Sequence, residues 1–252
     1  MARRRRIVIK LSGSSFAPDA MGSLGEMAAA LARAPAPIQP IVVAGGGPIA
    51  RAYIAHARAA GADESALDGI GIDVSRLNAR VLIHHLGDRA HPHPPETLRE
   101  AEDAADTGRI VVAGGLYPGQ STNGTAALLA ERLRADEFVN ATDVDAIYDS
   151  DPRANASARR LARVSVRDLR AMLAGEGSMA GGYDLMDMIA LKVIERSRLR
   201  ARVIRSEPRA ISAALRGRAA GTEITHEGRD SGRSRSRRAS RQTRASRTRR
   251  AS

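Results

Sequence analysis

The sequence IVVAGG occurs twice, at residues 41–46 and at residues 110–115, and each copy precedes a stretch with helical periodicity. A β-branched run followed by glycine is typical of a buried parallel strand that ends in a tight turn. The residues after the two copies differ (GPIARAY against LYPGQST), so the chain is not an internal repeat. We therefore expect two similar turns at two places in one sheet.

Strand-like and helix-like stretches alternate along most of the chain. Helical patterns cover residues 24–33, 48–60, 75–86, 95–105, 125–133, 166–173 and 185–196, and Ser165 with Asp168 forms a capping pair at the start of one of them. The short runs that read as strands are RIVIKL, PIVVAG, RIVVAG, EFVNAT and ARVIRS. This alternation predicts an α/β protein with a mostly parallel sheet and helices on both faces.

The net charge of +12 comes from the two ends of the chain. Residues 3–6 are four arginines, and residues 228–252 hold ten arginines and one aspartate. We expect a basic extension over residues 1–6, one domain over residues 7–227 with 26 basic and 27 acidic residues, and a disordered Arg/Ser-rich tail over residues 228–252. The tail favours at most weak, salt-sensitive contact with nucleic acid, and six aromatic residues argue against a base-stacking module.

Cysteine is absent, and no apolar run approaches the roughly 20 residues of a membrane helix. We therefore expect a soluble cytoplasmic protein without disulfides. The six histidines have no acidic or thiol partner at ligand spacing, so no protein-bound metal site is predicted.

Three glycine turns each follow a predicted strand and precede a predicted helix. They are Ser12-Gly13-Ser14, Gly45-Gly46-Gly47 and Gly114-Gly115. Such turns expose backbone N–H groups at a helix N-terminus, where an anion binds, and Arg51 lies one turn into the second helix. A single turn of this kind is usually structural, whereas three in one chain favour a ligand with several phosphates, or two such ligands.

The chain has 38 arginines but only two lysines, Lys10 and Lys192. Phosphate chemistry often uses such a compact ammonium, and the alternative for Lys192 is a solvated position on a helix. Asp143, Asp145, Asp149 and Asp151 follow the strand EFVNAT. Acids there can orient lysines, hold Mg²⁺ or bind ribose, and the alternative is an acidic surface turn.

Seven phrases, in order between about residues 7 and 224, resemble the archaeal type of UMP kinase within the amino acid kinase family. They are KLSGS, VVAGGGPIAR, LDGIGIDVSRLNARVLI, PPETLREAEDA, GGLYPGQSTNGTAALLAE, NATDVDAIYDSDPR and GGYDLMDMIALKVIERS. The resemblance implies a three-layer α/β/α sandwich and a homohexamer. It also implies Mg²⁺-dependent transfer of the γ-phosphoryl group of ATP to UMP, on the route to UTP and CTP.

The resemblance also implies roles for individual positions. Lys10 matches the catalytic lysine of the first strand, and Lys192 is the second candidate, with Asp143 or Asp145 steadying both lysines. The implied ATP-binding positions are Gly13, Ser14, Gly47, Arg51, Thr142, Tyr148 and Asp151. The implied UMP-binding positions are Gly46, Asp68 at the ribose, and the loop Leu116, Tyr117, Pro118, Gly119, Gln120, Ser121 and Thr122.

Some positions depart from the family pattern. Asn123 stands where some relatives have an acid, Ala146 replaces a glycine, and residues 204–207 lack an expected glycine. Two alternative functions stay open. One is a kinase of the same family for another small acceptor, such as isopentenyl phosphate or an amino-acid carboxylate. The other is a polyanion-binding protein that depends on its basic tail.

Overall fold

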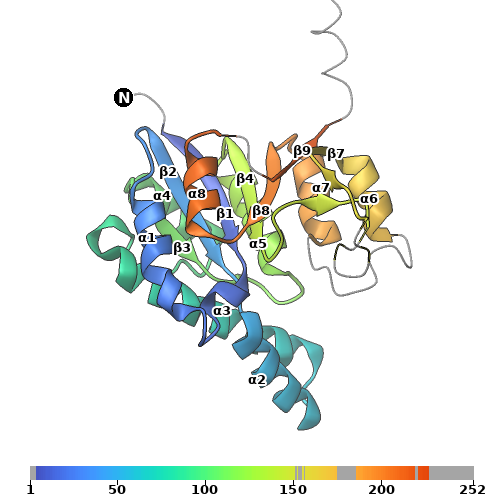
Figure 1. Ribbon diagram of the computed structural model, residues 1–252. Coiled ribbons are helices and arrows are strands. Elements are labelled where there is room, and N and C mark those ends of the chain that lie inside the picture. Colours follow the sequence, from blue (N-terminus) through green and yellow to red (C-terminus); the bar gives the residue numbers. More distant parts are fainter. Residues whose placement is uncertain are drawn as a thin grey trace, which may run out of the picture.

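Seven strands form one twisted sheet in the computed structural model, which describes residues 4–150, 152, 155, 157–174, 186–218 and 221–226 (Figure 1). The strand order is β3-β2-β1-β4-β8-β9-β7, and all neighbours are parallel except β8 and β9. The strands are β1 (Arg5–Leu11), β2 (Ile38–Ala44), β3 (Val111–Ala113), β4 (Glu137–Thr142), β7 (Arg163–Ser165), β8 (Ala201–Arg205) and β9 (Thr222–Thr225). A separate antiparallel pair joins β5 (Ile147–Tyr148) to β6 (Arg160–Leu161).

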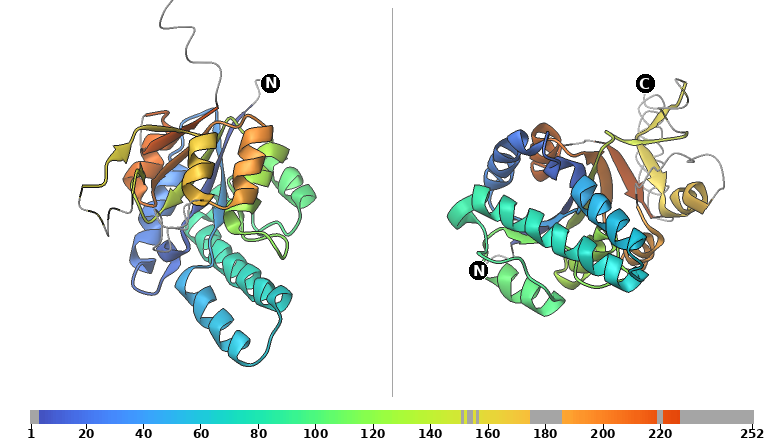
Figure 2. Two further views of the ribbon diagram at one scale, coloured as in Figure 1. Left: turned by 90° about the vertical axis from the view of Figure 1, so that its right-hand side faces the viewer. Right: turned by 90° about the horizontal axis from the view of Figure 1, so that it is seen from below.

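Helices cover both faces of the sheet, which confirms the predicted three-layer fold (Figures 1 and 2). One face packs against α1 (Leu24–Ala32), the second half of α3 (Glu64–Leu86) and α8 (Pro208–Leu215). The other face packs against α4 (Leu98–Asp106), α5 (Thr122–Arg132), α6 (Val166–Ala174) and α7 (Met188–Arg196). The helix α2 (Gly47–Ala59) and the start of α3 form a hairpin that extends beyond the sheet (Figure 1).

The strand β1 is buried on both faces of the sheet, which explains why its sequence is almost continuously apolar. Ile7, Ile9 and Leu11 pack into the core under α1, α3 and α8, whereas Val8 packs under α5. Lys10 lies on the same side as Val8 by this period of two. The strand thus delivers its lysine to the α5 side of the sheet, one residue before it ends.

The strand order places a crevice at the carboxyl ends of β1 and β4. These strands are neighbours in register, with Leu11 opposite Ala141. The chain continues from β1 toward α1 on one face, and from β4 toward α6 on the other face. Ligands in open α/β sheets bind where connections diverge in this way.

Most predicted elements are found within a few residues of the expected bounds. The exception is α3, which begins at Glu64 rather than at residue 75. Asp63 caps its N-terminus by accepting a hydrogen bond from Ala66 N at 2.8 Å, and Gly69 and Gly71 weaken the helical pattern of its first turns. The pair Ser165 and Asp168 does cap α6, since Asp168 N donates to Ser165 Oγ at 3.0 Å.

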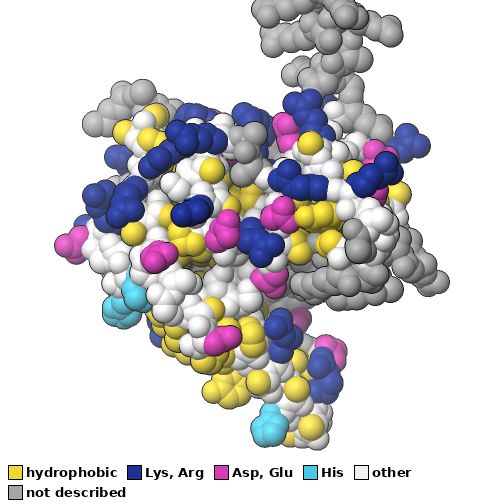
Figure 3. Space-filling view, in the orientation of Figure 1, with side chains coloured by type: hydrophobic (Ala, Val, Ile, Leu, Met, Phe, Trp, Pro, Cys, Tyr) yellow, Lys and Arg dark blue, Asp and Glu magenta, His cyan; other side chains and the backbone are white. Residues whose placement is uncertain are grey.

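Several short elements were not predicted, namely α8, β5, β6, β7 and β9. In addition, β1 begins at Arg5, so two residues of the predicted basic extension belong to the sheet. The predicted tail over residues 228–252 lies outside the described residues, as do residues 1–3. Within the part that is described, no helix is long and apolar enough to cross a membrane. On the face shown in Figure 3, basic and acidic side chains are interspersed.

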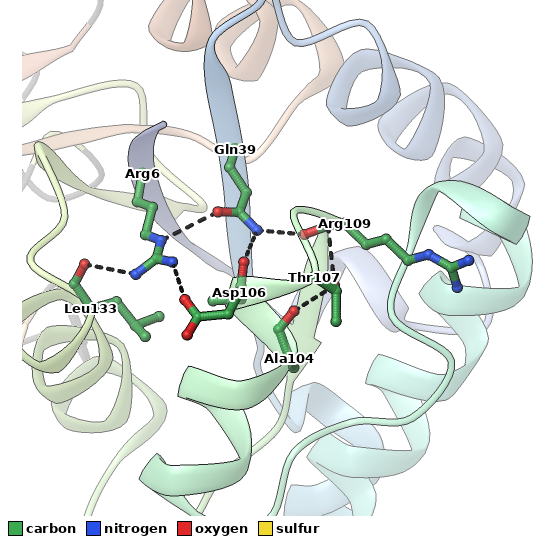
Figure 4. Close-up of polar contacts among 8 residues, drawn as sticks. Arg6, Gln39, Ala104, Asp106, Thr107, Arg109 and Leu133 are labelled. Carbon is green, nitrogen blue, oxygen red and sulfur yellow. Dashed lines mark hydrogen bonds and ion pairs between the residues drawn. The ribbon is translucent and has the colours of Figure 1, made fainter. Parts of the chain in front are cut away.

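A buried polar network ties the amino end of the sheet to its neighbours (Figure 4). Gln39 of β2, which is 2% exposed, donates its amide to Ala105 O at 2.7 Å and to Arg109 O at 2.8 Å. Its side-chain oxygen accepts from Arg6 Nε at 3.2 Å. Arg6 also donates to Asp106 Oδ1 at 2.8 Å. This Arg6–Gln39 network holds the turn between α4 and β3 at the end of the sheet far from the crevice.

We predict that Gln39→Ala lowers the free energy of unfolding by about 1–3 kcal/mol, because two buried carbonyl groups lose their donor. Urea denaturation followed by circular dichroism measures this change. An unchanged unfolding midpoint would show that the network adds nothing to stability.

Candidate active site

A cleft of about 920 Å³ opens at the carboxyl ends of β1, β2 and β4. The first turns of α2 and α5, the side of α3 and Leu173 of α6 complete its walls. All three glycine turns of the sequence contribute residues to this cleft. The structure therefore brings together segments that are more than 100 residues apart.

The turn after β1 is held by the first acid after β4. Ser12 Oγ donates to Asp143 Oδ1 at 2.8 Å, and the hydroxyl of Ser14 contacts both Ser12 Oγ and the same carboxylate. Ser12 also caps the short 3₁₀ helix Gly13–Phe16 by accepting from Ser14 N at 3.3 Å. Asp143, predicted to steady the lysines, thus joins the loops after β1 and β4 at the edge of the cleft.

Glycine is required where the turn after β1 meets the turn after β2. A Cβ atom on Gly13 would lie 2.1 Å from Gly47 N, and Gly47 has a positive φ of +69°. Real Cβ atoms do not approach backbone this closely, so the two backbones touch without intervening side chains. This contact fixes the position of the first turn of α2 relative to β1.

Two helix N-termini face the cleft. Gly46, Gly47 and Arg51 line it at the start of α2, with Pro48 in the first turn of that helix as predicted. Gln120, Ser121 and Thr122 line it at the start of α5. Ser121 caps α5 by accepting from Asn123 N at 3.0 Å and from Gly124 N at 3.1 Å. Both helix dipoles therefore favour anions in the cleft.

Among the described residues that line the cleft, Lys10 and Arg51 are the cations, and Asp68 and Asp143 are the acids. Lys10 is only 8% exposed, and it pairs in register with Val43 of β2 and Asn140 of β4. It lines the cleft one residue before the carboxyl end of β1, on the α5 side of the sheet. A buried ammonium there adds positive charge to that of the helix dipoles.

Asp68 projects from α3 toward the loop of residues 116–122. Its Oδ2 accepts a hydrogen bond from Gly119 N at 2.7 Å, and its side chain lines the cleft. The carboxylate thus holds this loop and also lines the cleft. Thr142, the last residue of β4, also lines the cleft.

Several predicted site residues lie elsewhere. Lys192 is exposed on α7 and is not among the residues that line the cleft. Asp145 accepts from Tyr148 Oη at 2.9 Å and pairs with Arg160 at 3.3 Å, beside the β5–β6 pair. The hydrogen bond to Asp145, together with burial, raises the pKa of Tyr148.

The first four residues of the predicted UMP loop, residues 116–119, lie outside the lining of the cleft. Leu116 is buried, whereas Tyr117 is exposed, and neither they nor Pro118 and Gly119 line the cleft. Asp151 lies outside the described residues. Among those that are described, no group of three or more His, Asp or Glu side chains could hold a metal ion.

One wall of the cleft was not predicted from the sequence, and the α2–α3 hairpin supplies it. Ile54 of α2 and Ile72 and Ser75 of α3 line this wall. Ser75 could have been noticed, because it is a polar residue inside the apolar stripe of the predicted helix over residues 75–86. Ile54 and Ile72 have no such signal, since they look like ordinary core positions.

Comparison with known proteins gives the family. The model for the amino acid kinase family matches residues 5–205. The chain belongs to the amino acid kinase family. The matched segment runs from the first residue of β1 to the last residue of β8 and contains the whole cleft.

Individual relatives match over nearly their full length. The chain is 41% identical to a uridylate kinase of Hyperthermus butylicus over 221 residues, which are 87% of this chain and 97% of that protein. The crystal structure of uridylate kinase from Archaeoglobus fulgidus superposes with a TM-score of 0.78 at 39% identity, covering 87% of this chain and 99% of that one. A UMP kinase structure from Bacillus anthracis, at 23% identity and a TM-score of 0.73, shares the fold.

We predict that Gly13→Ala lowers the free energy of unfolding by about 2 kcal/mol or more, because its Cβ atom would overlap Gly47 N and force the two turns apart. Gly22→Ala is the matched control, since a Cβ atom at Gly22 would have no neighbour within 4 Å. Urea denaturation of both variants compares them, and equal stability of the two would contradict the contact.

Proposed function

We propose that the protein transfers the γ-phosphoryl group of ATP to UMP, giving UDP and ADP. The observation that carries this proposal is that the N-termini of α2 and α5 open on one cleft, which Lys10 also lines. Each N-terminus suits one phosphate group, so the cleft suits two phosphate-bearing ligands that meet. The near full-length similarity to proteins named uridylate kinase supports UMP as the acceptor.

In this proposal the two ligands approach from opposite sides of the cleft. ATP contacts Gly13, Ser14, Gly47 and Arg51 through its phosphates, with its adenosine near Thr142 and Tyr148. UMP contacts Gly46 and the part of the loop that lines the cleft, Gln120, Ser121 and Thr122, with its ribose at Asp68. The phosphate of UMP then lies at the N-terminus of α5, in line with the γ-phosphorus of ATP.

The chemistry needs little from the protein beyond position and positive charge. In phosphoryl transfer the attacking and leaving oxygens lie in line, and negative charge is spread over the transferred group. In this proposal Lys10 stabilises this charge, together with the dipoles of the two helices. The oxygen of the UMP phosphate attacks directly, so no covalent enzyme intermediate forms.

Mg²⁺ is proposed to enter with ATP rather than to be held by the protein alone. Mg²⁺ usually keeps several waters and binds phosphates with one or two carboxylates. Asp143 lines the cleft beside the turn after β1, and its carboxylate fits such a contact. When bound, Mg²⁺ would neutralise phosphate charge.

Three further proposals rest on the family resemblance. They are that the protein is a homohexamer, that it acts in the cytoplasm, and that its product supplies UTP and CTP synthesis. The catalytic role of Lys192 also stays a prediction, as does that of Asp145, because neither side chain lines the cleft. Weak contact of residues 228–252 with nucleic acid is a separate prediction.

The proposed function is tested by an acceptor screen. ADP release from ATP is measured with UMP, isopentenyl phosphate and amino-acid carboxylates, and UDP is identified by chromatography. We expect kcat/KM for UMP to exceed that of every other acceptor by at least about 100-fold, since a site built to hydrogen-bond its substrate rejects analogues strongly. A higher kcat/KM for another acceptor than for UMP would contradict the proposed function.

We predict that Lys10→Ala lowers kcat by about 100-fold or more and changes KM for either nucleotide far less, because the ammonium acts mainly as charge develops in transfer. Lys10→Met keeps the apolar part of the side chain but removes the charge, so we expect the same loss of kcat. Steady-state kinetics with ATP and UMP measures both variants. An unchanged kcat in either would remove Lys10 from catalysis.

We predict that Asp68→Asn raises KM for UMP by about tenfold and leaves KM for ATP within about twofold, because a charge-assisted hydrogen bond to the acceptor ribose is lost. Glu64→Gln is the control, since Glu64 lies on the same helix and pairs with Arg58 away from the cleft. Equal effects of Asp68→Asn on the two KM values would contradict the assignment.

A further inference from the structure

The helix α3 carries two buried polar side chains that contact the two copies of IVVAGG. Asn78 is 3% exposed and Ser75 is fully buried. Polar side chains in such positions are retained in a core when they satisfy particular hydrogen bonds. We refer to Ser75 and Asn78 together as the α3 clamp.

Asn78 holds the turn that follows β2. Its Nδ2 donates to Gly45 O at 2.8 Å and to Gly46 O at 3.3 Å. These two carbonyls lie between the last residue of β2 and the first residue of α2. The amide of Asn78 therefore sets where the N-terminus of α2 begins.

Ser75 holds the turn that follows β3. Its Oγ accepts from Gly115 N at 2.7 Å and donates to Ile72 O, also at 2.7 Å. Arg76 adds a bond from its Nε to Gly115 O at 3.2 Å. A Cβ atom on Gly114 would lie 2.6 Å from Arg76 N, so this turn rests directly on the backbone of α3.

The two contacts come from one rigid element. Ser75 and Asn78 are three residues apart, which places them on one side of the helix, about 4.5 Å apart along its axis. The turn after β2 contributes to the first phosphate site, and the turn after β3 leads into the loop that reaches the second. A shift of α3 would therefore move both turns together, whereas loss of either hydrogen bond would move one turn relative to the other.

We propose that the α3 clamp sets the distance between the two phosphate-binding turns, and that Asn78 and Ser75 are positioning residues for phosphoryl transfer. This inference rests on the proposed function. Asn78 is not among the residues that line the cleft, so it acts through the turn it holds. Displacement of a reacting group by about 1 Å can cost about 100-fold in rate, so a positioning role predicts a large effect on kcat.

Gln39 provides a matched control for Asn78. It is equally buried, and its amide also donates to two backbone carbonyl groups, at 2.7 and 2.8 Å. It lies at the amino end of β2, whereas Asn78 contacts the turn at the carboxyl end of the same strand. Loss of either amide removes two hydrogen bonds to backbone carbonyl groups, but only the turn held by Asn78 lines the cleft.

The test compares Asn78→Ala, Ser75→Ala and Gln39→Ala with the wild-type enzyme at saturating ATP and UMP. We expect Asn78→Ala and Ser75→Ala each to lower kcat at least tenfold. We expect Gln39→Ala to keep kcat within twofold of wild type, although its melting temperature falls by an amount similar to that of Asn78→Ala. Thermal melting confirms that each variant is folded at the assay temperature. Ser75→Ala removes a single oxygen atom and is the variant that disturbs packing least.

Two outcomes would overturn the proposal. One is that Asn78→Ala and Ser75→Ala keep kcat within twofold of wild type while losing stability as Gln39→Ala does. The other is that all three variants lose kcat equally, which would reflect stability rather than position. The wild-type assay tests the proposed function separately. If the acceptor screen identifies another acceptor, the same comparison is made with that acceptor at saturation.

Discussion

Two phosphate-bearing ligands repel each other, and a protein that joins them must supply positive charge at a fixed spacing without filling the space between them. Parallel strands meet this constraint, because their carboxyl ends lie at one edge of the sheet and each leads to a helix N-terminus. Here the backbones of Gly13 and Gly47 meet without intervening side chains, and Lys10 lines the cleft that they border. The proposed mechanism follows from this arrangement.

The hydrogen bonds around the cleft show how the spacing is maintained. Asp143 joins the loops after β1 and β4, Asp68 holds the loop of residues 116–122, and the α3 clamp holds the turns after β2 and β3. Each bond uses a side chain from one element to fix the backbone of another. The groups that face the ligands are thereby held before any ligand binds, so little reorganisation is needed during transfer.

The strands of the sheet and the glycine turns that follow them could be predicted, because their signals are local in the sequence. A β-branched run that ends in glycine identifies both copies of IVVAGG, and the scarcity of lysine identified Lys10, which the structure places in the cleft. The start of α3 could not be predicted, because the packing of the α2–α3 hairpin overcomes the two glycines in its first turns. Lys192 and Asp145 looked similar to Lys10 and Asp143 in sequence, but only tertiary structure separates those that line the cleft from those that do not.

The central claim is that the two helix N-termini hold the two reacting phosphates on either side of Lys10. A crystal structure with UMP and a non-hydrolysable ATP analogue tests it most directly. We expect the UMP phosphate at the first turn of α5, the γ-phosphate of the analogue at Gly47, and the Lys10 ammonium within hydrogen-bonding distance of the γ-phosphate. A structure with either phosphate bound away from these turns, or with Lys10 directed away from both, would contradict the account.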